Sequence, residues 1–229
     1  MPSSAYLLVS HGSRDPRPQV AIDRLASLIQ KKIQAPVGTA TLECALVPLC
    51  EQIWQFSQRV DAPLKIVPLF LLPGVHVTAD VPQQVELAQQ QLGASPIALS
   101  PYLGAHPRLK QLLSKHLVPA DAHILLSHGS RRSGANLPVE ALAADLNALP
   151  AYWSVAPNLE TRLQELSHRG CQTIAILPYF LFAGGITDAI AQTIAQLAVR
   201  YPHLYLTLAD PLSANDELAD LIIDLMTIG

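Results

Sequence analysis

Two histidines and one glutamate have the residue types and the spacing expected of a site for a divalent metal ion. His11, Glu43 and His76 each lie at or just beyond the end of a short apolar run that is typical of a β-strand. The carboxyl ends of neighbouring parallel strands meet at one edge of a sheet, so we expect the three side chains to lie together. Two imidazoles and a carboxylate suit a borderline divalent ion, and histidine also exchanges protons near neutral pH. We therefore interpret His11 and His76 as catalytic residues and all three residues as metal ligands.

Each of the three residues also has an ordinary interpretation when it is taken alone. A single histidine at a strand end is more often structural, and Glu43 alone would be a solvated or capping carboxylate. His76 follows Gly74 and leads into a helix, so its side chain could cap that helix. The occurrence of all three at consecutive strand ends is what favours a site.

Two motifs occur twice in the chain, which indicates two copies of one domain. The two copies of each motif are LLVSHGSR at 7–14 with LLSHGSR at 125–131, and VPLFLLPGVH at 67–76 with LPYFLFAGGI at 177–186. The second copy has Ile186 in place of His76, and either Tyr152 or Trp153 in place of Glu43. We interpret this as one working half and one half whose site has lapsed.

Short apolar runs alternate with helical patterns along the whole chain, which is typical of parallel βαβ units. The expected strands are 5–10, 38–44, 64–72, 97–99, 123–127, 152–155, 173–182 and 204–208. The expected helices are 18–33, 48–59, 78–92, 107–115, 138–147, 159–168, 187–199 and 215–226. We predict an α/β fold of two similar small domains, 1–117 with the site and 118–229 with the lapsed site. Each is an open, mainly parallel sheet flanked by helices, and the active cleft is expected between them.

The loop after His11 offers groups that could bind an anionic substrate. A Gly-Ser pair after a strand makes a tight turn, and its backbone N–H groups could hold an anion at the following helix N-terminus. Arg14 and, in the second copy, Arg131 carry guanidinium groups that suit carboxylates. Solvated surface arginines are the ordinary alternative. We predict Ser13, Arg14 and Arg131 as substrate-binding residues.

The composition excludes several classes of protein. Of the 229 residues, 50% are hydrophobic and 14% are charged, which allows a sizeable core. The net charge of −3, without a basic run, argues against nucleic-acid binding. The sequence shows no signal peptide and no apolar stretch of about 20 residues, so we expect a cytoplasmic protein without membrane association. The three cysteines lack zinc or CxxC spacing, which fits free thiols in a reducing compartment.

The ordered motifs resemble those of the sirohydrochlorin chelatases, the ATP-independent class II cobalto- and ferrochelatases. The resemblance rests on LVSHGSRD, on Leu-Glu-x-Ala after the second strand and on PLFLxxGxHxxxD, and it covers the whole chain as the long form with two fused copies. It implies a chelatase-like fold, with His11 and His76 as metal-handling and proton-accepting residues beside Glu43. Pro73 and Val75 depart from the family's Ala-Gly-Gly-His loop, which implies a stiffer loop.

The same resemblance implies the reaction and the partners. The substrate would be sirohydrochlorin, a planar tetrapyrrole with many carboxylates, and the second substrate would be Co²⁺ for cobalamin or Fe²⁺ for siroheme, with Ni²⁺ as a third candidate. A cleft that binds the ring slightly distorted would expose its nitrogen lone pairs. No cofactor beyond the substrate metal is expected, and no P-loop is present. Because the fused halves supply internally what a homodimer would, we expect a monomer.

Two other functions compete with this one. A metal or tetrapyrrole carrier without turnover would use the same residues. A phosphoryl-transfer or hydrolytic enzyme with His11 as its nucleophile is suggested by His-Gly-Ser-Arg. That enzyme would need a basic anion pocket with several arginines, and it leaves His76 without a role.

Overall fold

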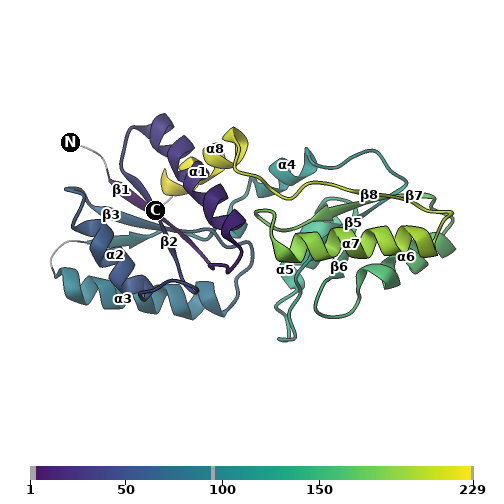
Figure 1. Cartoon of the computed structure of the whole chain (residues 1–229), viewed down its shortest axis with the longest axis horizontal. Helices are drawn as coiled ribbons and strands as arrows, with labels where there is room; N and C mark the ends of the chain where they lie inside the picture. Colours follow the sequence, from purple (N-terminus) through teal and green to yellow (C-terminus); the bar gives the residue numbers. More distant parts are fainter. Residues whose placement is uncertain (1–3, 94–95, 228–229) are drawn as a thin grey trace. The chain divides into compact units, whose positions relative to one another are not determined.

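The chain forms two four-stranded parallel sheets in this computed structural model, which describes residues 4–93 and 96–227 (Figure 1). It divides into two compact units. The first unit contains the described residues up to Leu109 together with those from Ala214 onward, and the second unit contains Lys110–Ser213. The predicted fold class, two small α/β domains with open parallel sheets flanked by helices, is confirmed.

The strands of the first unit are all parallel and stand in the order β2-β1-β3-β4. They are β1 (Ala5–Ser10), β2 (Val37–Thr41), β3 (Leu64–Pro68) and β4 (Ile97–Leu99). Because β1 pairs with both β2 and β3, the strand order reverses at β1. In open α/β sheets, ligands bind outside the carboxyl ends of the strands at such a reversal.

Helices cover both faces of this sheet. In Figure 1, α1 (Pro16–Ile33) and α8 (Asp216–Thr227) lie on one face, and α2 (Leu49–Ser57) and α3 (Val81–Leu92) lie on the other. The apolar core between the sheet and the α2–α3 face includes Ala5, Leu7, Val9, Leu49, Ile53, Ile66, Val81 and Val85. Burial on both faces explains why β1 and β3 are almost entirely apolar rather than alternating.

The first helix begins two residues before the predicted start because Asp15 caps it. The Asp15 carboxylate accepts a hydrogen bond from the backbone N–H of Arg17, and Pro16 occupies the first turn, where a missing N–H costs nothing. Lys31 and Lys32 lie in the last turn, where positive charge favours the helix dipole.

The second unit repeats the arrangement, with the parallel strand order β6-β5-β7-β8. Its strands are β5 (Ala122–Ser127), β6 (Ala148–Tyr152), β7 (Thr173–Pro178) and β8 (Tyr205–Leu208). Its helices are α4 (Leu109–Ser114), which begins at the unit boundary, α5 (Leu137–Asp145), α6 (Leu159–His168) and α7 (Gly185–Arg200). Apolar side chains of α6 and α7 pack on the sheet as α2 and α3 do in the first unit.

The last helix packs with the first unit although it follows the second copy in the sequence. Leu218, Leu221 and Leu225 of α8 are buried. At its start and middle, Asp216 and Asp220 pair with the Nζ atom of Lys32 of α1 at 3.1 and 2.8 Å. The compact units and the predicted halves, 1–117 and 118–229, therefore divide the chain differently.

The predicted strand at 152–155 was misplaced. The structure places β6 at Ala148–Tyr152, across Pro150, which sequence analysis assigned to the loop before the strand. Proline is excluded from central strands because it cannot donate to the ladder, but it is tolerated in edge strands. β6 is an edge strand of its sheet, so Pro150 fits there.

Three other strands end earlier than predicted. The predicted strands 38–44, 64–72 and 173–182 end at Thr41, Pro68 and Pro178. Apolar residues after these points are buried in loops rather than in the sheet: Leu69, for example, is 3% exposed. An apolar run therefore overestimates the length of a strand where the following loop also packs on the core.

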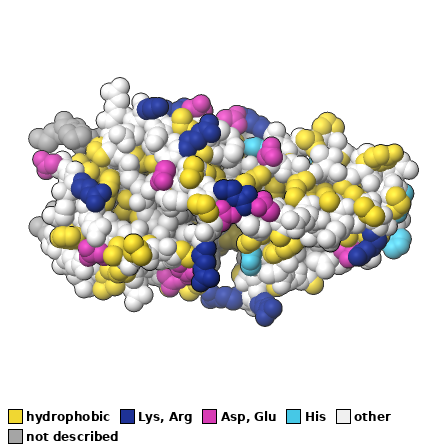
Figure 2. Space-filling model, viewed as in Figure 1, with side chains coloured by type: hydrophobic (Ala, Val, Ile, Leu, Met, Phe, Trp, Pro, Cys, Tyr) yellow, Lys and Arg dark blue, Asp and Glu magenta, His cyan; other side chains and the backbone are white. Residues whose placement is uncertain are grey.

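On the face shown in Figure 2, acidic and basic side chains lie beside one another at several points, with apolar side chains scattered between them.

Within the described ranges, every helix is too short or too polar to cross a membrane.

A buried histidine of the first unit, His106, gives a predicted pH dependence of stability. Its side chain is 5% exposed, and its Nδ1 atom accepts a hydrogen bond from the Arg108 N–H at 3.1 Å. Burial lowers the pKa of His106, Arg108 lowers it further, and Asp224 of α8 opposes both. Folding therefore favours the neutral ring, so its stabilising contribution is present above the ordinary histidine pKa of 6.5 and is lost as pH falls from there towards the lowered value.

We expect the His106→Asn variant, which keeps an acceptor but does not titrate, to lose less stability than the wild type between about pH 7 and pH 5. The measurement is the midpoint of thermal unfolding as a function of pH. His168→Asn, at an exposed histidine, is the matched control and should keep the wild-type slope. Equal slopes for His106→Asn and the wild type would contradict the assignment.

Candidate metal centre

The structure brings the three predicted ligands together at the carboxyl ends of β1, β2 and β3. His11 directly follows β1, Glu43 lies two residues beyond β2, and His76 lies just after the loop that follows β3. Their ligand atoms all lie within 4.8 Å of one another, and this is the one such group of three or more potential ligands found in residues 4–93 and 96–227. His11 Nε2 lies 3.7 Å from Glu43 Oε2, and the ring centroids of His11 and His76 are 4.8 Å apart.

Gly12 allows the loops after β1 and β2 to touch. The Glu43 N–H donates to the His11 carbonyl oxygen at 2.8 Å, so the two ligands are joined through the backbone. Gly12 has φ +97°, and a Cβ atom there would lie 2.0 Å from the Glu43 carbonyl oxygen. Only glycine fits this conformation and this close approach.

His76 begins a short π-helical segment, His76–Asp80, which leads into α3. The Gly74 carbonyl accepts hydrogen bonds from the N–H groups of Val77 and Thr78, and the Thr78 hydroxyl also donates to it. One helical turn later, Asp80 Oδ2 lies 2.7 Å from His76 Nδ1. Single π turns are frequent at functional sites. No role was predicted for Asp80, although the spacing His-x-x-x-Asp was a usable signal.

The geometry suits an ion that enters and leaves. Ligands about 2.1 Å from a divalent ion lie about 3–4 Å apart around it, so small side-chain rotations would bring the three onto one ion. The side chains of His11 and Glu43 are 52% and 53% exposed, and that of His76 is 33% exposed. Two imidazoles and one carboxylate suit Co²⁺, Fe²⁺ or Ni²⁺ and leave coordination positions open.

The second unit keeps the backbone of this site and has His128 at the position of His11, but it lacks the other two ligands. Ser154 donates its N–H to the His128 carbonyl, as Glu43 does to His11, so the counterpart of Glu43 is Ser154. The prediction of Tyr152 or Trp153 was wrong because β6 begins and ends earlier than expected. Burial raises the pKa of the Tyr152 hydroxyl to about 12, with Glu140 contributing, so this side chain stays neutral.

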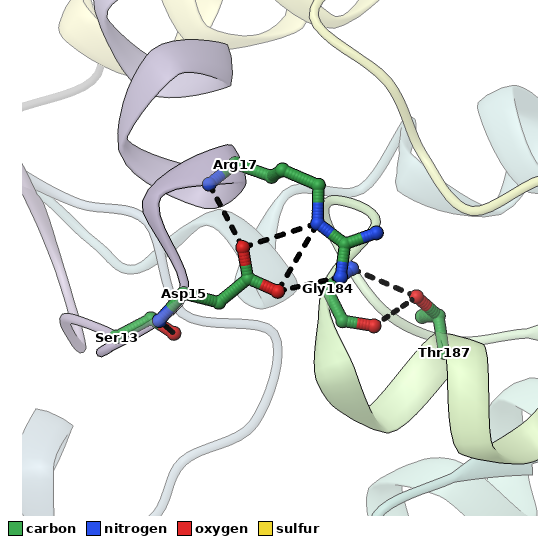
Figure 3. A network of polar contacts seen from close by, with 5 residues as sticks. All are labelled: Ser13, Asp15, Arg17, Gly184 and Thr187. Atoms are coloured by element: carbon green, nitrogen blue, oxygen red, sulfur yellow. Dashed lines mark hydrogen bonds and ion pairs between the residues drawn. The ribbon is translucent and has the colours of Figure 1, made fainter.

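In the second unit, the loop equivalent to the His76 loop is held by hydrogen bonds between its own residues. Thr187 Oγ1 donates to the Gly184 carbonyl and accepts from the Gly184 N–H, both at 2.8 Å (Figure 3). The Asp188 N–H donates to the Gly184 carbonyl as the Thr78 N–H donates to that of Gly74. With this alignment Ile186 is the counterpart of His76, as predicted.

Of the predicted substrate-binding residues, Ser13 is engaged within its own loop. Its hydroxyl accepts a hydrogen bond from the Asp15 N–H at 3.0 Å, and the Asp15 carboxylate binds Arg17 (Figure 3). The N-terminus of α1 thus already holds a carboxylate, and the hypothesis of an anion at that point gains no support. Arg14 and Arg131 are exposed and form no ion pair within the part of the chain that the structure describes, which leaves both guanidinium groups available.

Comparison with known proteins identifies the family. The family model described as CbiX matches residues 5–120 and again 122–227. A sirohydrochlorin ferrochelatase of Priestia megaterium is 23% identical over 95% of this chain and 87% of its own length. A sirohydrochlorin cobaltochelatase of the same organism is 24% identical over 90% of this chain and 73% of its own length.

Solved structures share the fold. SirB from Bacillus subtilis with Fe³⁺ superposes with a TM-score of 0.81, at 20% identity, over 98% of this chain and 94% of that chain. CbiX, described as the terminal enzyme for biosynthesis of siroheme in denitrifying bacteria, superposes with a TM-score of 0.69, at 24% identity, over 97% of both chains.

The contact at Gly12 predicts that Gly12→Ala separates the His11 and Glu43 loops. We expect a loss of about 1–3 kcal/mol of unfolding free energy from the strained backbone, together with weaker Co²⁺ binding. Chemical denaturation and a Co²⁺ titration measure the two effects. Gly74→Ala is the matched control, because a Cβ atom there meets nothing within 4 Å and should leave stability near that of the wild type. Equal stability of the two variants would contradict this account of Gly12.

Proposed function

Because the chain belongs to the CbiX family, we propose that it inserts a divalent metal ion, Co²⁺ or Fe²⁺, into sirohydrochlorin without ATP. The observation that carries the proposal is the convergence of His11, Glu43 and His76 at three neighbouring strand ends. The relatives named above comprise both a ferrochelatase and a cobaltochelatase of sirohydrochlorin. Co²⁺, Fe²⁺ and Ni²⁺ all accept this set of ligands. The ligand types therefore do not distinguish the three ions, and the assay below does.

The reaction exchanges one metal ion for two protons. The ion loses water and forms bonds to the ring nitrogens, while the two pyrrole N–H bonds break and their protons leave the macrocycle. His11 and His76 hold the incoming ion, and each can accept a proton once its nitrogen lone pair is released by transfer of the ion to the ring. Glu43 balances the charge of the ion. No step consumes a nucleotide.

Apolar side chains on the site loops suit the flat face of a tetrapyrrole. Leu46 lies three residues beyond Glu43 with its side chain fully exposed, at 106% of the reference area, and Val75, next to His76, is 42% exposed. These two apolar side chains lie on loops that carry ligands. A macrocycle that covers them would explain why they are exposed to solvent. Arg14 and, from the second unit, Arg131 are proposed to bind its acetate and propionate groups.

That the chain acts as a cytoplasmic monomer and binds no nucleic acid stays a prediction from the sequence. Sedimentation equilibrium tests whether the chain is a monomer. Titration with labelled DNA or RNA tests whether it binds nucleic acid.

The proposed roles predict that His11→Ala, Glu43→Ala and His76→Ala each slow insertion by about 100-fold or more, as expected for loss of a catalytic acid–base group or ligand. The assay follows the absorbance of sirohydrochlorin with Co²⁺, Fe²⁺ or Ni²⁺ under anaerobic conditions, without ATP. His128→Ala, the equivalent strand-end histidine of the second unit, is the matched control and should keep the wild-type rate. Binding of metal and tetrapyrrole without acceleration over the protein-free rate would instead indicate a carrier.

The exposure of Leu46 predicts a second, separable effect. We expect Leu46→Asp to raise KM for sirohydrochlorin about tenfold, because burying a leucine on a ligand contributes about 1.5–3 kcal/mol, and to leave Co²⁺ binding unchanged. Steady-state kinetics at saturating Co²⁺ and a Co²⁺ titration measure these effects. Val199→Asp, at an exposed valine of α7, is the control. An unchanged KM would remove Leu46 from the substrate site.

A further inference from the structure

The two histidines of the site differ in how their rings are held. His76 Nδ1 lies 2.7 Å from Asp80 Oδ2, within hydrogen-bonding distance. His11, by contrast, forms no ring hydrogen bond with any residue in the described ranges, and its Nε2 atom lies 3.7 Å from Glu43 Oε2. One ring is therefore fixed by a carboxylate, and the other can turn.

The contact with Asp80 determines which nitrogen of His76 can bind a metal. A carboxylate only accepts hydrogen bonds, so the proton of the neutral imidazole must lie on Nδ1. The lone pair then lies on Nε2, the nitrogen remote from Asp80. Metal-binding histidines commonly donate their other ring N–H to a carboxylate, which fixes the tautomer and makes the ligand more basic.

The backbone places the two side chains for this contact. His76 and Asp80 are the first and last residues of the π-helical segment, which is closed by a hydrogen bond from the Val81 N–H to the His76 carbonyl. Residues four apart in a helix share one side. The Gly74 carbonyl anchors the start of the segment through the Thr78 N–H and hydroxyl.

The second unit lacks both members of the pair. With Gly184 matching Gly74, the counterparts of His76 and Asp80 are Ile186 and Ile190, and Ile190 is fully buried in the core. The carboxylate is thus absent where the histidine is absent. α7 has a carboxylate, Asp188, in its first turn, but none at the position that matches Asp80.

We propose that Asp80 is a positioning residue that holds His76 as the Nδ1–H tautomer, so that Nε2 binds the metal. The proposal rests on the proposed function only for the choice of ion. Asp80 acts through His76 and does not touch the metal, and outer carboxylates of this kind are typically worth 10–100-fold in metal affinity.

The test combines two readouts that do not need turnover. Nitrogen-15 NMR of histidine-labelled protein, with the His76 signals assigned from His76→Ala, should show the Nδ1–H tautomer in the wild type and a shift towards Nε2–H in Asp80→Ala. Titration with Co²⁺ alone should show affinity lowered about 10–100-fold in Asp80→Ala. Asp80→Asn keeps an acceptor oxygen and should recover part of both. Asp23→Ala is the control, because it removes side-chain hydrogen bonds from Gln19, four residues earlier on α1, and from Thr39.

An Nε2–H tautomer in the wild type, or an Asp80→Ala variant with wild-type tautomer and Co²⁺ affinity, would overturn the proposal. Equal losses in Asp80→Ala and Asp23→Ala would also overturn it, because they would show a general effect on stability. If Co²⁺ binds as expected and insertion is absent, the proposed function fails while the role of Asp80 stands.

Discussion

The site depends on one constraint, which is that three parallel strands end side by side at the same edge of a sheet. Neighbouring strands lie about 4.8 Å apart, and the ligand atoms of His11, Glu43 and His76 lie within 4.8 Å of one another. The order β2-β1-β3 places the loops that carry Glu43 and His76 on either side of His11, and the paths of these loops bring the three side chains together. Gly12 is also required, because only glycine lets the loop after β1 lie this close to the backbone of Glu43. The ligands need only to turn towards an ion.

Comparison of the two units shows that the frame and the ligands are separable. The second unit has the same strand order, the same backbone hydrogen bond between the first two loops and the same glycine turn before its long helix. It has Ser154 and Ile186 where the first unit has Glu43 and His76. The frame is stabilised by its buried apolar core, to which half-exposed ligands contribute little. Loss of the ligands therefore leaves the fold intact.

The alternation of apolar runs and helices was enough to predict both sheets and the convergence of the three ligands, because these follow from local pattern and strand direction. What was missed depends on longer-range facts. Pro150 argues against a strand until its edge position is known, and that error moved the counterpart of Glu43 away from Ser154. The packing of α8 with the first unit buries Leu218, Leu221 and Leu225 and joins residues far apart in the sequence, which no local pattern reveals. Asp80 was visible in the sequence, but its contact required the π turn.

The exposure of the three candidate ligands bears on whether a bound metal would be a resident cofactor or a substrate. A resident metal is usually held by a closed set of ligands, each fixed by a further hydrogen bond. Here the His76 ring is held by Asp80, whereas His11 and Glu43 are about half exposed and face each other beyond hydrogen-bonding distance. One fixed and two movable ligands can capture an ion from solvent and then release it to stronger donors, because the movable ligands detach first. The four nitrogens of a tetrapyrrole are such donors. The looseness of the site is thus a property expected where the metal is cargo.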